Sequence, residues 1–346
     1  MKNIFELLKN KKILITGGTG FFGKWLIKFF FEFNNLLNLD AKLFVLSRNP
    51  SKLYEIFPWL KNYNYIKFIK GDVRNFKFFK EKISYFIHGA LPATYTQIEP
   101  LELLDIGING TKRVLEFAKY CEAEKFLFIS SGVIYGKQLF NGKKILENSF
   151  GSLKIDPKNP KIYYTEAKRI GELLCYGAMK EWGLNIVIAR CFSFIGPFMP
   201  LDAHFAIGNF IRDALKGGPI VIESDGTKIT SYMYAEDLAY WLWTILLKGK
   251  PGEAYNVGSE KEISLKELAK KIAEIYAELT GKKVCIIIKK QPEPGKIPER
   301  YVPSTEKAKK ELGLKETISL EEAIKRTFKF YQTFQGALPE FQSLSK

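Results

Sequence analysis

The chain has 346 residues, 46% hydrophobic and 26% charged, with no apolar run of the roughly 20 residues that span a bilayer, which excludes a disordered or membrane-spanning protein. Its four scattered cysteines form no CxxC pair and it has only two histidines, so we expect neither a disulfide framework nor a metal site. The 53 basic and 37 acidic residues give a net charge of +16 without a dense basic block, so we expect no nucleic-acid or membrane partner.

The first 190 residues alternate between short apolar runs and amphipathic stretches. The opening MKNIFELLKN holds an apolar piece interrupted by Glu6, which makes a poor signal peptide and predicts a cytoplasmic protein. Beyond it we expect strands in six apolar runs, at 11–16, 41–47, 65–71, 83–89, 125–130 and 185–190. Helices are expected at about 20–33, 99–120 and 160–183. This alternation predicts a parallel sheet with helices on both faces.

A glycine-rich loop joins the first predicted strand to the first predicted helix. In TGGTGFFG, Gly17 permits a tight turn, Gly20 lets the backbone approach a pyrophosphate, and Gly23 allows the helix to pack closely on the strand. The spacing is GxxGxxG, and its strand–loop–helix context strongly indicates dinucleotide binding. We therefore predict an α/β fold with a Rossmann-type doubly wound parallel sheet. The predicted cofactor site also takes in three neighbouring residues, Phe21, Phe22 and Ala90.

The end of the second predicted strand indicates which cofactor is bound. An NAD enzyme would place Asp or Glu there to accept the ribose hydroxyls. This chain offers Ser47 and Arg48 instead, with Lys52 nearby. A hydroxyl and a cation suit a 2′-phosphate, so NADP is favoured over NAD, and the alternative is an ordinary surface arginine. After the third strand, GDVRN offers Asp72 to the adenine amino group and Val73 to the face of its ring.

The stretches SSGVIYG and KIYYTEAKRIGE carry the predicted catalytic residues. Tyr164 and Lys168 are four residues apart, which places both side chains on one face of a helix. The pKa of tyrosine is near 10, and a neighbouring ammonium lowers it, so Tyr164 is the expected proton acceptor. Lys168 is also expected to hold the nicotinamide ribose. Ser131 is expected to hydrogen-bond the substrate hydroxyl, whereas Ser130 is expected to be structural and Tyr135 to pack.

Beyond residue 190 the pattern loosens. We expect a strand pair around 219–224 and 228–234. Four helices are expected, at 204–218, 236–249, 264–279 and 319–332. The sequence thus predicts an NAD(P)-binding Rossmann domain at 1–190. A smaller, mixed α/β lobe at 191–346 is expected mainly to bind substrate, with some segments returning to the Rossmann core.

Several motifs follow one another across nearly the whole chain: TGGTGFFG, GDVRN, SSGVIYG, YYTEAK, ARCFSFIGP, YAEDLAYW, AYNVGS and RYVPSTEKAKKELG. In this order they resemble the extended short-chain dehydrogenase/reductases of the nucleotide-sugar epimerase/dehydratase family. The resemblance implies that Tyr164, Lys168 and Ser131 form the catalytic triad. It implies that Arg300 grips the diphosphate of a nucleotide-diphosphate sugar. It also implies a homodimer formed through two helices of each subunit.

Two departures from the family pattern concern the grip on the substrate. Ser193 stands where the family usually has Asn, and Thr230 replaces a frequent phosphate-binding Arg. We nevertheless place Ser193 in the substrate site. Asn209, in HFAIGNFI, is a second expected substrate contact, for which a loop or helix-surface position is the alternative.

The residues that follow Ser131 bear on the reaction, which is expected to begin with oxidation at C4 of the sugar. A 4,6-dehydratase needs a further acid and base, which family dehydratases commonly supply as Asp-Glu directly after the equivalent of Ser131. This chain has Gly132 and Val133 there, neither of which transfers protons. We therefore predict a 4-epimerase or a 4-keto-sugar reductase.

Two alternatives remain open from the sequence. Carboxylates from elsewhere, such as Glu166 or Asp202, could restore dehydratase chemistry. A non-catalytic dinucleotide-binding or RNA-binding relative on the same fold is a remote alternative, kept open by the net charge. The intact set of catalytic residues argues against it.

Overall fold

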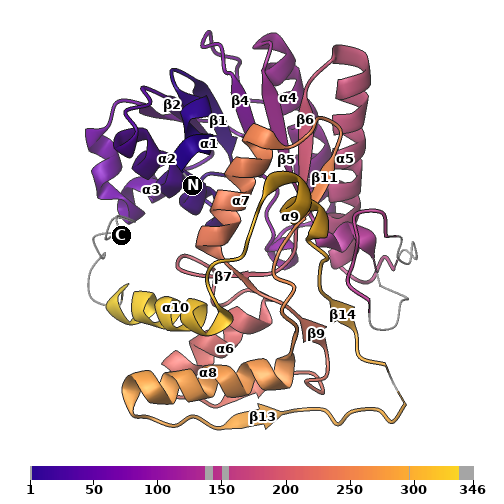
Figure 1. Ribbon diagram of the computed structural model, residues 1–346. Helices are drawn as coiled ribbons and strands as arrows, with labels where there is room; N and C mark the ends of the chain where they lie inside the picture. Colours follow the sequence, from indigo (N-terminus) through magenta and orange to yellow (C-terminus); the bar gives the residue numbers. More distant parts are fainter. Residues whose placement is uncertain (1, 137–142, 150–155, 296, 335–346) are drawn as a thin grey trace.

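The computed structural model describes residues 2–136, 143–149, 156–295 and 297–334. Figure 1 shows a large sheet with its flanking helices above a smaller lobe built from the later part of the chain. None of the described helices is long and apolar enough to cross a membrane.

Seven parallel strands form the large sheet in the order β3-β2-β1-β4-β5-β6-β11. Six of them match the six predicted strands, and the seventh comes from AYNVGS, for which no strand was predicted. Their bounds are β1 Lys12–Thr16, β2 Lys42–Ser47, β3 Ile66–Lys70, β4 Tyr85–His88, β5 Lys125–Ser131, β6 Ile186–Cys191 and β11 Ala254–Val257. The predicted Rossmann-type sheet is thereby confirmed.

Helices cover both faces of this sheet, so each strand buries side chains in two cores. Along β1, Ile13 and Ile15 face one core, while Leu14 faces the other. Two helices, α4 (Pro100–Tyr120) and α5 (Lys161–Trp182), pack side by side on the second face. On the first face, α2 (Phe21–Leu36) packs against α7 (Ala235–Lys248). There Phe30 lies beside Trp243, and burying each such side chain stabilises the fold by about 1.5–3 kcal/mol.

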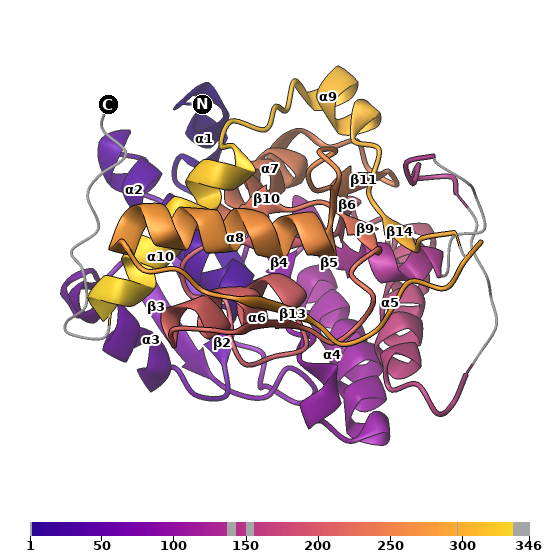
Figure 2. The same ribbon diagram turned by 90° about the horizontal axis from the view of Figure 1, so that it is seen from below.

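The smaller lobe lies beyond the carboxyl ends of the strands, as the view from below shows (Figure 2). Its main elements are α6 (Ala206–Leu215), β8 (Ile220–Ile222), α8 (Leu265–Thr280), β13 (Ile286–Ile288) and α10 (Leu320–Phe334). The remaining helical turns are α1 Lys2–Phe5, η1 Glu6–Leu8, α3 Ser51–Ile56, η2 Pro58–Asn62, η3 Tyr95–Gln97, η4 Gly132–Tyr135 and α9 Glu306–Leu312. The remaining strands are β7 Phe194–Ile195, β9 Ile229–Thr230, β10 Met233–Tyr234, β12 Ile263–Ser264 and β14 Arg300–Tyr301.

The predicted pairing of 219–224 with 228–234 is wrong. β8 pairs in parallel with β13, more than sixty residues later, whereas β9 lies between β12 and β14, and β10 pairs with β7. Asp225 accepts hydrogen bonds from the backbone and hydroxyl of Thr227, in a local turn that separates the two stretches. The strand partners are distant in sequence, so the local pattern did not reveal them.

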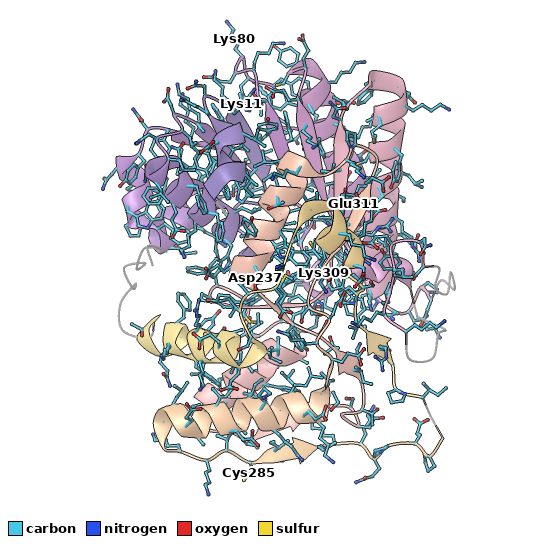
Figure 3. All side chains as sticks on the ribbon, in the orientation of Figure 1. Lys11, Lys80, Asp237, Cys285, Lys309 and Glu311 are labelled. Atoms are coloured by element: carbon cyan, nitrogen blue, oxygen red, sulfur yellow. The ribbon has the colours of Figure 1, made fainter. Side chains whose placement is uncertain are left out.

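The chain beyond residue 190 also contributes to the sheet side of the molecule through α7 and β11. Asp237, near the start of α7, lies where this helix meets the segment leading to α10 (Figure 3). Its carboxylate accepts hydrogen bonds from the backbone and hydroxyl of Thr317 and from the backbone of Ile318. The division of the chain into domains at residue 190 stays a prediction.

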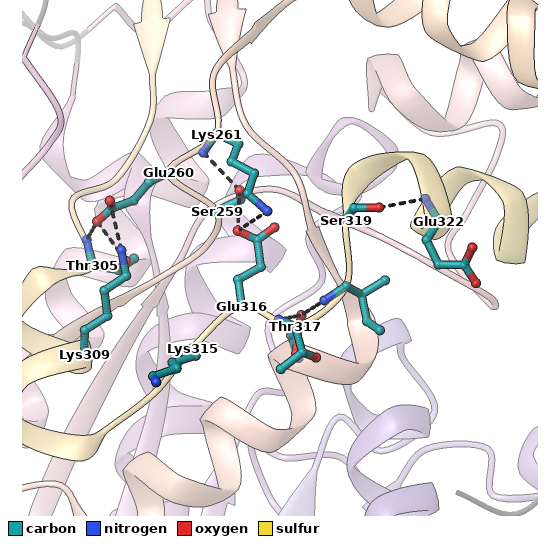
Figure 4. A network of polar contacts seen from close by, with 12 residues as sticks. Ser259, Glu260, Lys261, Thr305, Lys309, Lys315, Glu316, Thr317, Ser319 and Glu322 are labelled. Atoms are coloured by element: carbon teal, nitrogen blue, oxygen red, sulfur yellow. Dashed lines mark hydrogen bonds and ion pairs between the residues drawn. The ribbon is translucent and has the colours of Figure 1, made fainter. Parts of the chain in front are cut away.

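The segment between β14 and α10 is fastened by polar contacts at two points (Figure 4). Glu260 accepts hydrogen bonds from the backbone and hydroxyl of Thr305, and pairs with Lys309 at 3.0 Å. Glu316 accepts a hydrogen bond from Ser259 at 3.0 Å. These contacts hold the residues just after β14 close to β11, and β14 carries two residues of the site described next.

Candidate active site

A cavity of about 1200 Å³ lies between the carboxyl ends of the strands and the smaller lobe. In doubly wound sheets this is the usual place for a ligand. Nearly all predicted site residues line it: Gly17, Gly20, Phe21, Phe22, Gly23, Ser47, Arg48, Asp72, Val73, Ala90, Ser131, Tyr164, Lys168, Ser193 and Arg300. Asn209 is not among the lining residues; it lies on α6, where its amide oxygen accepts a hydrogen bond from Arg212.

The glycine loop comes so close to neighbouring backbone that side chains do not fit. A Cβ on Gly17 would lie 2.6 Å from the carbonyl oxygen of Gly89, and Gly17 has a φ of +78°. A Cβ on Gly23 would lie 2.4 Å from the Cα of Gly18. The loop therefore leads into α2 without side chains at Gly17 and Gly23, and this close backbone at a helix N-terminus fits the phosphates of a dinucleotide.

Three cations surround the end of β2, where two were expected. Arg48 and Lys52 line the cavity together with Lys24 of α2. Burial and the neighbouring charge of Lys52 lower the pKa of Lys24. Ser47 lies beside them, and its hydroxyl accepts a hydrogen bond from the Asn49 backbone. Such a cluster favours a ligand that carries a phosphate at this end of the cavity.

The Asp72 carboxylate already forms an ion pair within the protein. Its carboxylate accepts hydrogen bonds from Arg74 at 2.8 and 2.9 Å, and this contact lowers the pKa of Asp72. Val73 packs against α4, where a Cβ on Gly110 would lie 2.7 Å from it. Both residues line the cavity as predicted, and Arg74 holds the Asp72 carboxylate in one orientation.

A buried histidine connects the strand ends beneath the glycine loop. His88 Nδ1 lies 2.7 Å from the Thr16 hydroxyl, and His88 Nε2 lies 3.0 Å from the Thr111 hydroxyl. The Thr16 hydroxyl also accepts a hydrogen bond from the Gly89 backbone. Burial, followed by the charge of Lys168, lowers the pKa of His88 to about 3, so its ring stays neutral. The histidine holds the backbone against which Gly17 packs.

The three predicted catalytic side chains meet at the other end of the cavity. Ser131 ends β5, while Tyr164 and Lys168 share one face of α5. The Lys168 ammonium donates to the Ile129 carbonyl at 2.6 Å, and burial lowers its pKa to about 8. Burial raises the pKa of Tyr164, against which a hydrogen bond with Ser131 acts.

The pKa of Tyr164 therefore differs from the sequence-based expectation. The Lys168 ammonium lies 5.7 Å from the centre of the Tyr164 ring and is directed to a carbonyl. Ser131, and not Lys168, is the group that lowers the pKa of the phenol. The expectation considered only the spacing along the helix and not the carbonyl of the adjacent strand.

Ser130 belongs to a buried polar network below the site. Its hydroxyl donates to Glu172 at 2.5 Å, and Glu172 also accepts two hydrogen bonds from Arg190. Arg190 in turn donates to the Tyr135 hydroxyl, which donates to Asn256. The network joins β5, α5, β6 and β11. Ser130 and Tyr135 thus have structural contacts, as expected from the sequence.

The structure adds residues to the catalytic end that the sequence did not reveal. The ring of Tyr95 stacks on that of Tyr164 with centroids 5.3 Å apart, and the His204 ring lies 4.3 Å from Tyr95. Tyr301 of β14 packs against Phe192, with centroids 4.8 Å apart. The four added residues line the cavity but come from segments far apart in the sequence: Tyr95, Phe192, His204 and Tyr301.

Two lysines lie near Arg300 and were also missed. Lys161 and Lys228 line the cavity, and burial followed by the charge of Lys228 lowers the pKa of Lys161. Lys228 pairs with Glu299 at 3.2 Å, and Arg300 pairs with Glu262. Lys161 precedes Tyr164 by three residues on the same helix. Its position on the helical face of the catalytic pair was the signal that could have identified it.

Carboxylates are scarce among the described residues that line the cavity: there are only Asp72 and Glu299. Asp72 lies at the cofactor end, and Glu299 pairs with Lys228. Glu166 and Asp202, which could have supplied an acid and a base, are not among the lining residues. Glu166 instead accepts a hydrogen bond from Arg169 at 2.8 Å.

Comparison with known proteins gives consistent matches. The model of the NAD dependent epimerase/dehydratase family matches residues 13–258. UDP-glucuronic acid decarboxylase 1 of Xenopus tropicalis is 27% identical over 93% of this chain and 72% of its own length. dTDP-D-glucose 4,6-dehydratase of Dictyostelium discoideum is 31% identical over 77% of this chain and 62% of its own length.

Solved structures give the same picture of the fold. An epimerase from Methanothermobacter thermautotrophicus has a TM-score of 0.79 and 27% identity, over 96% of both chains. UDP-glucuronic acid 4-epimerase from Bacillus cereus, in complex with NAD, has a TM-score of 0.77 and 24% identity, over 94% of this chain and 98% of its own. The second likeness bears on the fold alone.

Proposed function

Because the chain belongs to the NAD-dependent epimerase/dehydratase family, we propose that it oxidises and reduces C4 of the sugar in a nucleotide-diphosphate sugar. The reaction is a 4-epimerisation or the reduction of a 4-keto sugar. Family members act on nucleotide sugars through a nicotinamide dinucleotide, and the glycine loop at the start of α2 fits such a cofactor. A bound cofactor would accept a hydride from C4 and return it in an epimerisation, or deliver a hydride to the C4 carbonyl in a reduction.

The chain's own residues handle the proton in this proposal. The Ser131 hydroxyl stabilises the Tyr164 phenolate before the reaction, and this phenolate then takes the proton from the C4 hydroxyl and becomes a phenol. Lys168 lies one helical turn further along α5, where its ammonium can hold the nicotinamide ribose. The ring of Tyr95 covers Tyr164 and limits the access of water to the phenol.

The observation that carries the proposal is that no acid pair follows Ser131. A dehydratase must move a proton from C5 and protonate the hydroxyl leaving C6, which takes two further proton-transferring groups. Gly132 and Val133 stand after Ser131, and the described carboxylates that line the cavity are Asp72 at the cofactor end and Glu299, which pairs with Lys228. The 4,6-dehydratase, the activity of several relatives, remains the alternative.

NADP is the proposed cofactor form. The cluster of Lys24, Arg48 and Lys52 supplies positive charge beside Ser47, where a 2′-phosphate would lie. NAD is the cofactor in the Bacillus cereus epimerase structure. The alternative is therefore that this chain also binds NAD, with its three cations contacting solvent in place of a 2′-phosphate. The preference is a property of this chain's own residues at the end of β2.

For the substrate, Arg300 and the two nearby lysines are the proposed diphosphate contacts. Thr230 cannot provide the charge of the arginine usual at its position, whereas Lys161 and Lys228 both face the cavity near Arg300. Ser193 also lines the cavity and remains a proposed contact. Asn209 does not line the cavity in this structure, so its contact with substrate stays a prediction without support from the geometry.

We also propose that the chain forms a homodimer and acts in the cytoplasm. The exposed sides of α4 and α5 carry large apolar residues: Leu101 is 80% exposed, Leu173 67% and Tyr176 38%. A second copy packing its α4 and α5 against them would bury these side chains. Sedimentation should give twice the monomer mass for the wild type, and Leu173→Glu should yield monomers.

The proposal is tested with a panel of nucleotide-diphosphate sugars, with and without NADPH, analysed by NMR and mass spectrometry. An epimerase changes the configuration at C4 without changing the mass, and a reductase adds two mass units only with NADPH. Loss of 18 mass units would make the protein a dehydratase. Tyr164→Phe should abolish turnover while leaving cofactor binding unchanged, and full activity in that variant would refute the assignment.

A nucleic-acid shift assay across a salt series addresses the remote alternative. Binding driven by phosphate contacts weakens steeply with salt. We expect no shift at physiological salt. A specific, salt-sensitive shift together with no turnover would instead favour the RNA-binding alternative.

A further inference from the structure

One side chain at the catalytic end has no part in the chemistry described so far. Tyr301 lies in β14, more than a hundred residues from the motifs that carry Ser131 and Tyr164, yet its phenol reaches the same place. Its oxygen lies 2.7 Å from where a Cβ would stand on Gly132, next to Ser131. An interaction with the Ser131 hydroxyl lowers the pKa of Tyr301, as it lowers that of Tyr164, against the effect of burial.

The Tyr301 phenol also fills the room that a side chain at position 132 would need. A Cβ on Gly132 would lie 2.7 Å from the Tyr301 oxygen and 2.8 Å from the ring of Phe192. Contacts this short require a neighbour to move. The two rings pack on each other and leave little room for that. An acidic side chain at position 132 and the observed position of Tyr301 therefore exclude each other.

The backbone around Tyr301 is held from several sides. Tyr301 is in register with Thr230 of β9, and the next residue, Val302, accepts a hydrogen bond from the Ile145 backbone at 2.9 Å. Ser304 donates to the Ile145 carbonyl at 2.8 Å. The phenol is therefore placed by the β14 segment and not by a loop of its own.

We propose that Tyr301 is a positioning residue for the C4 chemistry: its phenol orients the Ser131 hydroxyl toward Tyr164 and occupies the place of the dehydratase acid. The direction of the hydrogen bonds follows from the proton on each group. Burial raises the pKa of both phenols, and Tyr164 is the one that must lose its proton for the C4 step, so Tyr301 keeps its proton and donates to Ser131. Ser131 then has its own hydrogen to donate to the Tyr164 phenolate.

This inference rests on the proposed function and adds a structural reason why the site supports C4 chemistry and not dehydration. With Tyr301 in place, the site has a donor chain aimed at the C4 oxygen and no room for an acid at position 132. The same residue thus supports proton transfer at C4 and excludes one way of supplying the acid for the departing C6 hydroxyl.

The placement is tested without turnover, by a double-mutant cycle on stability. Gly132→Ala should lower the thermal midpoint clearly in the wild-type background, because its methyl group meets the phenol oxygen and the Phe192 ring. In Tyr301→Phe, which lacks that oxygen, Gly132→Ala should cost distinctly less. Equal losses in the two backgrounds would overturn the proposed placement of Tyr301.

The positioning role is tested by the kinetics of Tyr301→Phe on the substrate found with the panel. Loss of one hydrogen bond to Ser131 should lower kcat about 10-fold and leave KM within about 2-fold. The rising limb of the pH–rate profile should move upward by about 0.5–1 pH unit, because the Tyr164 phenolate is less well stabilised. Tyr65→Phe, which removes a hydroxyl bonded to Asn35 away from the cavity, is the matched control.

The outcomes separate this inference from the proposed function. If the wild type is active, Tyr164→Phe is inactive and Tyr301→Phe keeps the wild-type kcat and pH profile, the positioning role is wrong and the function stands. If the wild type turns over no sugar of the panel, the proposed function fails, while the stability cycle still decides the placement of Tyr301.

Discussion

Replacing Glu172 by Gln should destabilise the protein more than any exposed charge replacement. The Glu172 and Arg190 side chains are only 7% and 13% exposed, with Arg190 Nη2 2.8 Å from one carboxylate oxygen and Nε 3.1 Å from the other. At an effective dielectric constant of about 20, charges about 4 Å apart attract by about 4 kcal/mol. Gln keeps the size of the side chain and one acceptor but leaves the guanidinium without a counter-charge.

We therefore expect Glu172→Gln to lower the free energy of unfolding by about 3 kcal/mol. Arg190 keeps its bonds to the Tyr135 hydroxyl and the Glu147 carbonyl, so a loss at the lower end of the range for broken buried pairs is expected. The assay is urea unfolding followed by circular dichroism. Glu306→Gln is the control, since its ion pair with Lys310 is exposed and should contribute less than about 1 kcal/mol.

Equal losses in the two variants, or a loss below about 1 kcal/mol for Glu172→Gln, would show that the Glu172–Arg190 pair contributes no more to stability than an exposed ion pair. A second variant separates charge from packing. If the loss comes from an uncompensated charge, replacing both Glu172 and Arg190 by Met should recover part of the stability.

Three further predictions follow from the cofactor end of the cavity. Arg48→Ala should weaken NADP binding about 10- to 100-fold and leave NAD binding unchanged, as measured by calorimetry; equal effects on both would contradict the 2′-phosphate assignment. His88 stays neutral in the folded protein to about pH 3, whereas in the unfolded chain it binds a proton below about pH 6.5. The free energy of unfolding should therefore fall by about 1.4 kcal/mol per pH unit as the pH drops from about 6.5 to about 3. His88→Gln should lack that part of the slope, and an unchanged slope would contradict the assignment. Gly23→Ala should abolish dinucleotide binding because its Cβ meets the Gly18 backbone, whereas Gly177→Ala, with open space around its Cβ, should bind normally.

The sequence was a good guide to the sheet and its helices for a physical reason. Strands covered on both faces are almost entirely apolar, and the helices between them are long and amphipathic. The same reasoning missed β11, β13 and three two-residue strands, β7, β12 and β14. It also paired 219–224 with the wrong partner, because β13 lies more than sixty residues away.

The site residues, too, were predictable only where they belong to a local sequence pattern. Residues tied to a local pattern, such as the glycine loop or the pair of Tyr164 and Lys168, were placed in the cavity by the sequence. Tyr95 and Tyr301 were not, because only the tertiary fold brings their segments to Ser131. Lys161 was the exception, since its spacing from Tyr164 was visible in the sequence.

Reaction of the active nucleotide sugar in heavy water distinguishes chemistry confined to C4 from a dehydration. Chemistry confined to C4 returns a hydride from the cofactor and leaves the C5 hydrogen in place. We expect a product changed at C4 with no carbon-bound deuterium by NMR. Deuterium at C5 together with the loss of water would contradict this expectation and make this protein a dehydratase.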